Sequence, residues 1–119
     1  MMLQVSPEGG FVEGAPDQSL MLRPEDASLV IEACFSVAVR AAVLYPANLT
    51  PEFFDLSSGE AGAILQKLRN YRIRVAVVCP PGTVSFSTRF GEMAEEETRG
   101  KHFGFVDSRD AAREWLKKT

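Results

Sequence analysis

The chain has 119 residues, of which 45% are hydrophobic and 24% are charged, and its formal net charge is −3. This length and composition suit one globular domain with a hydrophobic core, so we assign residues 1–119 to a single domain. The negative charge and the dispersed basic residues argue against a nucleic-acid partner, and the apolar runs are too short to cross a membrane. No signal peptide follows Met1, which predicts a cytoplasmic protein.

Cysteine and histidine are scarce, with two cysteines and one histidine in the chain. Cys34 falls in a helical pattern and Cys79 ends a predicted strand, so we expect buried free thiols and no disulfide. These two residues and His102 cannot form a zinc site of nitrogen and sulfur ligands. We therefore predict no metal and no cofactor.

The first part of the chain predicts a hairpin, a helix and a strand. Residues 3–5 and 11–13 flank a glycine-bearing turn, which is typical of two antiparallel strands. Residues 24–36 begin with a proline and acidic residues and continue with a helical apolar stripe. Residues 39–45 form the next strand, which Pro46 ends.

The stretch from Phe53 to Val78 predicts a helix that leads into a buried strand. Apolar residues recur at the helical spacing of three and four positions, at Ala61, Ile64, Leu65, Leu68 and Tyr71. The following Val75–Val78 run has no polar alternation, as expected for a strand that is covered on both faces. A helix followed by such a strand indicates a parallel sheet.

The last part of the chain predicts a helix, a short strand and a final helix. The first helix extends to about Arg99, and Gly100 ends it as the C′ glycine. Residues 103–106 form the strand, and Asp107-Ser108 caps the last helix. The whole order predicts an α/β fold with a mostly parallel sheet, an N-terminal hairpin and helices on the faces of the sheet.

The segment FFDLSSGEAGAILQKL at residues 53–68 resembles a bacterial family known as domain of unknown function 4180. The likeness continues through Asn70-Tyr71, the VAVV strand at 75–78 and Arg99-Gly100 to the final helix. The loop Cys79–Gly82 departs from the family pattern. The resemblance implies an uncharacterised bacterial protein, and it brings no activity with it.

A less extensive likeness is to STAS domains, the anti-sigma-factor antagonists, which are similar in length and element order. These domains carry a phosphorylated serine in an Asp-Ser-Ser-Gly sequence at the start of a helix. Ser58 matches that serine, although Leu56 interrupts the motif. The resemblance implies a STAS-like regulatory domain.

The leading functional hypothesis is a non-enzymatic regulatory or protein-interaction module. Its contact surface would combine the helix start at Ser57, Ser58 and Gly59 with the aromatic pair Phe53-Phe54, and its partner would be another protein or a second copy of the chain. A simpler interpretation is that the serines cap the helix and that the two phenylalanines fold into the core.

The alternative is a protein that binds a small anionic metabolite, or a modest enzyme, with its pocket at the carboxyl ends of the strands. Polar residues follow those strand ends: Asn48, Ser57, Ser58, Ser85, Ser87, Arg89 and Asp107. The simpler interpretation is that each of them caps a helix or faces water. Catalysis is not favoured, because His102 lies at the start of a strand, at the opposite end from Ser58.

Overall fold

The computed structural model describes residues 3–5 and 10–118, and this part of the chain forms one mixed β-sheet. Its strands lie side by side in chain order: β1 (Leu3–Val5), β2 (Val12–Gly14), β3 (Ala41–Leu44), β4 (Arg74–Val78) and β5 (Phe103–Val106). β1 is antiparallel to β2 and all other pairs are parallel, which confirms the predicted hairpin and parallel sheet. Residues 7–9 of the predicted turn lie outside the described residues.

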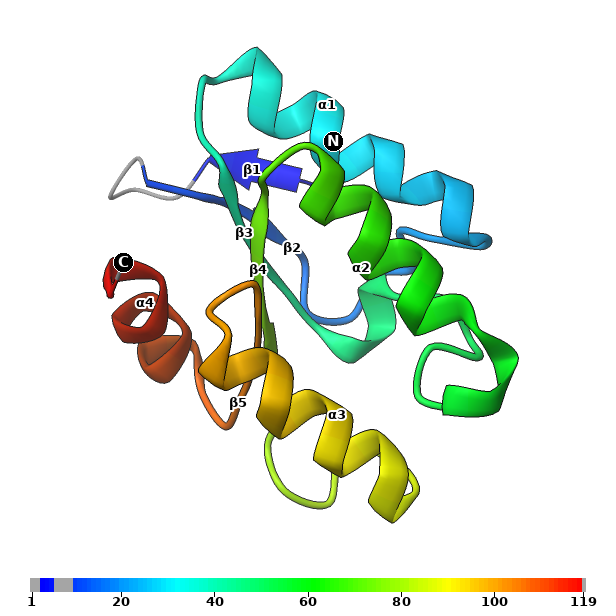
Figure 1. Cartoon of the computed structure of the whole chain (residues 1–119). Helices are drawn as coiled ribbons and strands as arrows, with labels where there is room; N and C mark the ends of the chain where they lie inside the picture. Colours follow the sequence, from blue (N-terminus) through cyan, green and yellow to red (C-terminus); the bar gives the residue numbers. More distant parts are fainter. Residues whose placement is uncertain (1–2, 6–9, 119) are drawn as a thin grey trace.

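The helices are α1 (Ser28–Ser36), α2 (Glu60–Asn70), α3 (Thr88–Arg99) and α4 (Arg109–Lys117), and 3-10 turns occur at η1 (Pro24–Ala27), η2 (Pro46–Asn48) and η3 (Leu56–Ser58). Figure 1 shows α1, α2 and α3 on one face of the sheet and α4 on the other. Right-handed connections between successive parallel strands place their helices on the same face. None of the helices in the described residues has the length and apolar character that a bilayer crossing needs.

β4 is the strand that is covered on both faces, as its sequence predicts. Val75 and Val77 face the larger core beneath α1, α2 and α3, whereas Ala76 and Val78 face the smaller core beneath α4. All four side chains are buried. The absence of polar alternation in this strand therefore follows from its central place in the sheet.

Arg74, the first residue of β4, fastens the end of α4 to the sheet. Its Nε donates to the Lys101 carbonyl at 2.7 Å, and Nη1 donates to the Leu116 carbonyl at 2.9 Å. Nη2 donates to the carbonyls of Trp115 at 3.2 Å and Lys118 at 3.1 Å. The guanidinium carbon also lies 4.5 Å from the Trp115 ring centroid. One arginine thus binds the carbonyl groups that a helix C-terminus leaves unpaired.

α3 covers the outer edge of β5, which is an edge strand of the described sheet. Thr98 Oγ1 accepts the Phe105 N–H at 3.1 Å and donates to the Ala94 carbonyl at 2.8 Å. The indole Nε1 of Trp115 donates to the Thr98 carbonyl at 3.2 Å. The Phe105 N–H, which would otherwise be open to another strand, is therefore satisfied within the chain.

The turns that lead from helices into β3, β4 and β5 each contain a residue with positive φ that is not glycine. These residues are Ala38 at 59°, Arg72 at 58° and Lys101 at 66°. The prediction that Gly100 is the C′ glycine was wrong, because Gly100 is the C-cap residue and its φ is −76°. Gly100 still follows the helical path, with its N–H donating to the Glu96 carbonyl at 3.0 Å, and the reversal falls on Lys101.

A substitution of Ile64, which is fully buried in α2, tests the predicted stripe. We expect Ile64→Asp to remove cooperative thermal unfolding, because a buried unpaired carboxylate costs several kcal/mol against a total stability of about 5–15 kcal/mol. Ala63→Asp on the exposed side of the same helix is the control, and it should change the stability by about 0.5 kcal/mol or less. Calorimetry that gave equal melting temperatures for the two variants would contradict this placement of α2.

Candidate functional site

The two serines predicted at the start of the central helix lie in η3, directly before α2. Asp55 caps this turn: its Oδ1 accepts the Ser57 N–H at 3.1 Å and the Ser57 hydroxyl at 2.6 Å. The Ser58 hydroxyl lies 2.7 Å from the Asp55 carbonyl and 2.9 Å from the Glu52 carbonyl. Gly59, at φ 78°, turns the chain into α2. Both serines are exposed, and their hydrogen bonds hold the turn together.

The surroundings of Ser58 favour a structural hydroxyl over a nucleophile or a phosphate site. Its proton is directed at backbone carbonyls, and its oxygen accepts the Glu60 N–H at 3.2 Å. His102 precedes β5 at the opposite edge of the sheet, so it supplies no general base here. A phosphate in this turn would gain the N-terminus of α2, but it would meet the carboxylate of Asp55.

The aromatic pair Phe53-Phe54, which was expected to form part of a contact surface, packs largely into the core. Phe53 is fully buried, with its ring centroid 6.0 Å from that of Phe90 and 6.1 Å from that of Phe103. Phe54 is half-buried and packs 5.3 Å from Phe90 and 6.0 Å from Phe105. These rings gain more free energy by filling the core beneath α2 and α3 than by facing water.

Asn48, the candidate predicted after β3, is a buried structural residue. Its Nδ2 donates to the carbonyls of Ala15 at 2.7 Å and Gln18 at 2.8 Å, while Oδ1 accepts the Tyr45 N–H at 2.8 Å. Gly14 allows this close approach, because a Cβ there would lie 2.3 Å from Asn48 Oδ1. The amide ties the loop after β2 to the end of β3, and these bonds leave it little capacity for a ligand.

The hollow that reaches Ser87 does not bring together the remaining candidates from the carboxyl edge of the sheet. Ser87 caps α3 by accepting the Phe90 N–H at 3.1 Å, and Arg89 is exposed on that helix. Ser87 lines one end of a shallow hollow of about 770 Å³ that follows α3 to Phe105. Asn48, Ser58 and Arg89 are not part of its wall. This arrangement gives little support to a small-ligand pocket at the carboxyl ends of the strands.

The carboxyl edge of the sheet also carries a polar cluster that the sequence did not predict. Arg109, at the start of α4, forms a bidentate pair with Glu13 of β2, with Nε 2.9 Å from Oε2 and Nη2 3.0 Å from Oε1. The Tyr45 hydroxyl donates to the same carboxylate at 2.6 Å. Burial, together with the Glu13 bond, raises the pKa of Tyr45 to about 12. The cluster joins α4 to the sheet across 96 positions of sequence, which no local pattern could reveal.

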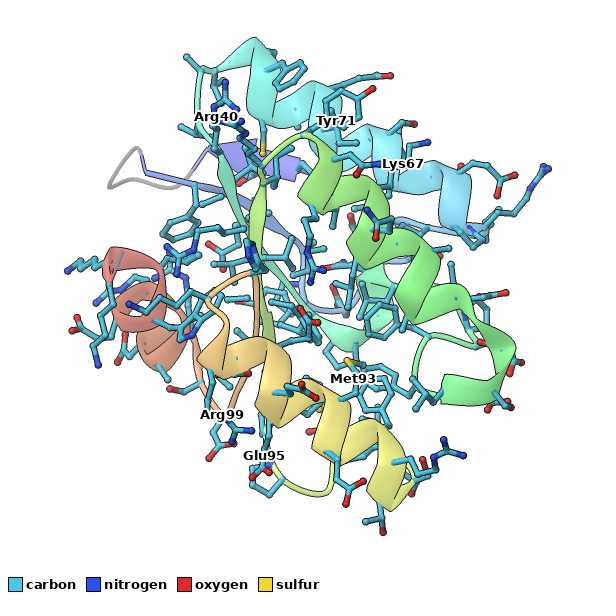
Figure 2. The ribbon with its side chains drawn as sticks, viewed as in Figure 1. Arg40, Lys67, Tyr71, Met93, Glu95 and Arg99 are labelled. Atoms are coloured by element: carbon cyan, nitrogen blue, oxygen red, sulfur yellow. The ribbon has the colours of Figure 1, made fainter. Side chains whose placement is uncertain are left out.

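Two exposed aromatic side chains contact each other at the amino edge of the sheet, where α1 and α2 end. Phe35 is 54% exposed and Tyr71 is 46% exposed, and their rings meet edge to face with centroids 5.8 Å apart. Val37 is 37% exposed in the same turn region. Arg40 Nη1 donates to the Tyr71 carbonyl at 3.4 Å, and Figure 2 shows both residues at this end of the molecule. We name Phe35, Val37, Arg40 and Tyr71 the amino-edge patch.

A model of one protein family, described as a domain of unknown function (DUF4180), matches residues 10–116 of the chain. The chain belongs to the DUF4180 family. The comparison with curated proteins and the comparison with solved structures give no match. The likeness to STAS domains is not shown by any of these comparisons.

The two thiols of this DUF4180 protein are free and buried, as predicted. Burial raises the pKa of Cys34 to about 11. Burial also raises the pKa of Cys79, and the nearby Asp107 carboxylate acts in the same direction. Both thiols are therefore protonated at neutral pH, which makes them poor nucleophiles. No group of three or more histidine, cysteine, aspartate or glutamate residues within 3–5 and 10–118 is arranged to hold a metal ion.

We expect both thiols to react slowly with a thiol reagent at pH 8 in the native DUF4180 protein. The reaction should accelerate at least a hundredfold in guanidinium chloride, where the two groups recover an ordinary pKa near 8.5. A spectrophotometric assay of thiol release measures both rates. Rapid modification of Cys34 in the folded protein would contradict the raised pKa and the burial that causes it.

Asn48→Asp tests the structural role of the buried amide. The carboxylate would face the Ala15 and Gln18 carbonyls, which accept bonds from the amide, so we expect a loss of about 2–4 kcal/mol at pH 7. This repulsion raises the pKa of the new carboxyl group in the folded state. The loss in the free energy of unfolding therefore develops as the pH rises above about 4, and it shrinks below that pH. Urea unfolding at pH 4 and pH 7, with Ser85→Asp as the exposed control, measures the difference.

Proposed function

We propose that this DUF4180 protein is a non-enzymatic interaction module that binds a protein partner, either another protein or a second copy of the chain, through the amino-edge patch. The observation that carries this proposal is the pair of exposed, mutually packed aromatic rings of Phe35 and Tyr71. Tyrosine, phenylalanine and arginine are enriched in protein interfaces, and tyrosine and arginine are also enriched among the residues that contribute most of the binding energy. The patch supplies these residue types in one place, with Arg40 bonded to the end of α2.

This proposal moves the contact surface from the start of α2 to its end. The hydroxyls of η3 lie before Glu60 and the Tyr71 ring follows Asn70, so the 11 residues of the helix separate them by about 16 Å. The contact surface expected from the sequence is less suited to binding a partner, because Phe53 is buried and the Ser58 hydroxyl is hydrogen-bonded to the backbone of its own turn. A modification of Ser58 could regulate the amino-edge patch only if its effect were transmitted along the length of α2.

The packed geometry of the patch supports a role in binding. Phe35 belongs to α1 and Tyr71 caps the C-terminus of α2, so each ring stands on a helix that is fixed by the larger core. Such rings lose little conformational entropy when a partner covers them, because the scaffold already limits their positions. The module is proposed to act in the cytoplasm, and the partner would be another protein or a second copy of this chain.

A photo-crosslinking amino acid at position 35 tests this function in cells of the source organism. We expect a covalent adduct from position 35 and none from position 114, an exposed site on α4 across the sheet. The mass of the adduct separates a second copy of the chain from a different protein. Tyr71→Ser should lower the yield at position 35 about tenfold, since the loss of an aromatic contact that contributes about 1.4 kcal/mol weakens binding by that factor. Equal yields at the two positions, or none at 35, would refute the proposal.

A further inference from the structure

A hollow of about 550 Å³ opens at the amino edge of the sheet, and most of the residues that line it are basic. Its wall consists of Arg69, Arg72, Arg74, Gly100, Lys101 and His102. These residues come from the ends of α2 and α3 and from the starts of β4 and β5, so the hollow lies between two neighbouring helix-to-strand connections. We name this group of residues the basic hollow.

The positive charge of the basic hollow is only partly compensated. Arg69 forms an ion pair with Glu97. Arg74 directs its donors at neutral backbone carbonyls, so its charge is held in place without a carboxylate. Neither Arg72 nor Lys101 has a carboxylate partner within residues 3–5 and 10–118. In a chain of net charge −3, this is an unusual concentration of cations.

The ends of α2 and α3 offer a competing explanation for these cations. Basic residues are favoured at helix C-termini, where the macrodipole places about half a negative charge. These two ends, together with the end of α4 that Arg74 binds, offset about one and a half units of charge. Glu97 offsets one more. Four permanently charged side chains line the hollow, so it keeps a positive excess after both effects. Helix ends alone therefore do not account for the number of cations gathered here.

The backbone conformation of the two turns shows that the turns do not require the charged side chains at these positions. Arg72 and Lys101 have positive φ, and so does Ala38 in the corresponding turn before β3. The left-handed conformation thus belongs to the connection itself, and glycine would adopt it with less strain. An arginine and a lysine stand at these positions in the two turns that border the hollow. Their long side chains are not needed to form the turns.

We propose that the basic hollow binds a small phosphoryl anion that carries two or more negative charges, with Arg72 and Lys101 as its direct contacts. The volume falls within the range of about 300–1,000 Å³ that is usual for small-molecule sites. Arginine and lysine both bind phosphate oxygens through charge-assisted hydrogen bonds. Arg74 contributes a fixed charge behind them, because its own hydrogen bonds are already made to the chain. This site is independent of the proposed protein partner.

The test uses pyrophosphate as the probe and the full chain as the receptor. Calorimetry should show a rise in Tm of about 4 °C or more when pyrophosphate is present at about ten times its Kd. Sodium chloride at matched ionic strength should not reproduce the rise, and citrate should give a smaller one if phosphoryl geometry matters. Titration calorimetry then gives the Kd. No rise beyond that in matched sodium chloride would overturn the site, and an equal rise with citrate would overturn the phosphoryl preference.

Glycine substitutions remove the two charges without straining the turns. The double variant R72G/K101G should keep or increase the melting temperature, because glycine suits the positive φ, while its affinity for pyrophosphate falls at least tenfold. Ala38→Gly makes the same backbone change in the third turn and should keep the wild-type affinity. Retained affinity in the double variant, or an equal loss in Ala38→Gly, would overturn the site. Asparagine, which also tolerates positive φ, provides a second pair of variants, R72N and K101N, with the same expected loss.

Discussion

The structure depends on four parallel strands that follow one another in both sequence and space. β2, β3, β4 and β5 are neighbours in chain order, and each connection between them carries a helix. Because parallel connections are right-handed, α1, α2 and α3 must cover the same face of the sheet, and α4 is left to cover the other. The same constraint directs the C-terminal ends of α1, α2 and α3 toward one edge of the sheet. The amino-edge patch and the basic hollow both lie there for this reason.

Hydrogen bonds and ion pairs of polar side chains attach parts of the chain that contribute little to the hydrophobic core. The α4 helix buries few large side chains, and Ala112 is the member of it that is fully buried. Its attachment is strengthened at one end by Arg109 with Glu13 and at the other end by Arg74. Elsewhere in the structure, Asn48 holds the loop after β2 against the end of β3. Each of these groups has its hydrogen bonds satisfied, so its partial burial is compatible with stability.

Local patterns in the sequence predicted most of the fold. The spacing of Ala61, Ile64 and Leu68 gave the buried stripe of α2, and the valine run gave β4. The cap of α4 was also correct, because Ser108 Oγ accepts the Ala111 N–H at 3.1 Å. These features are determined by residues within one or two helical turns of each other, and short-range chemistry is what a single sequence displays.

The candidate site could not be predicted in the same way. The carbonyl groups that Asn48 binds lie about thirty positions away in the chain, and those that Arg74 binds lie more than twenty-five positions away. Phe53 and Tyr71 are both aromatic residues in the same central stretch, yet one is buried and the other is half exposed. Their difference depends on how α1, α2 and α3 meet over the sheet. Sequence spacing on a single helix does not contain that information.

The hydrogen bond from Phe105 to Thr98 has a consequence for the way this chain can assemble. A foreign strand that approaches β5 finds its N–H at Phe105 already occupied and the body of α3 beside it. Lateral growth of the sheet in that direction, whether into a continuous two-molecule sheet or into a fibril, requires α3 to detach first. Detachment would also remove the Thr98 carbonyl from Trp115, so it would disturb the cover on both faces of the sheet at once. Thr98 and the α3 helix that carries it together shield this margin of the sheet from polymerisation.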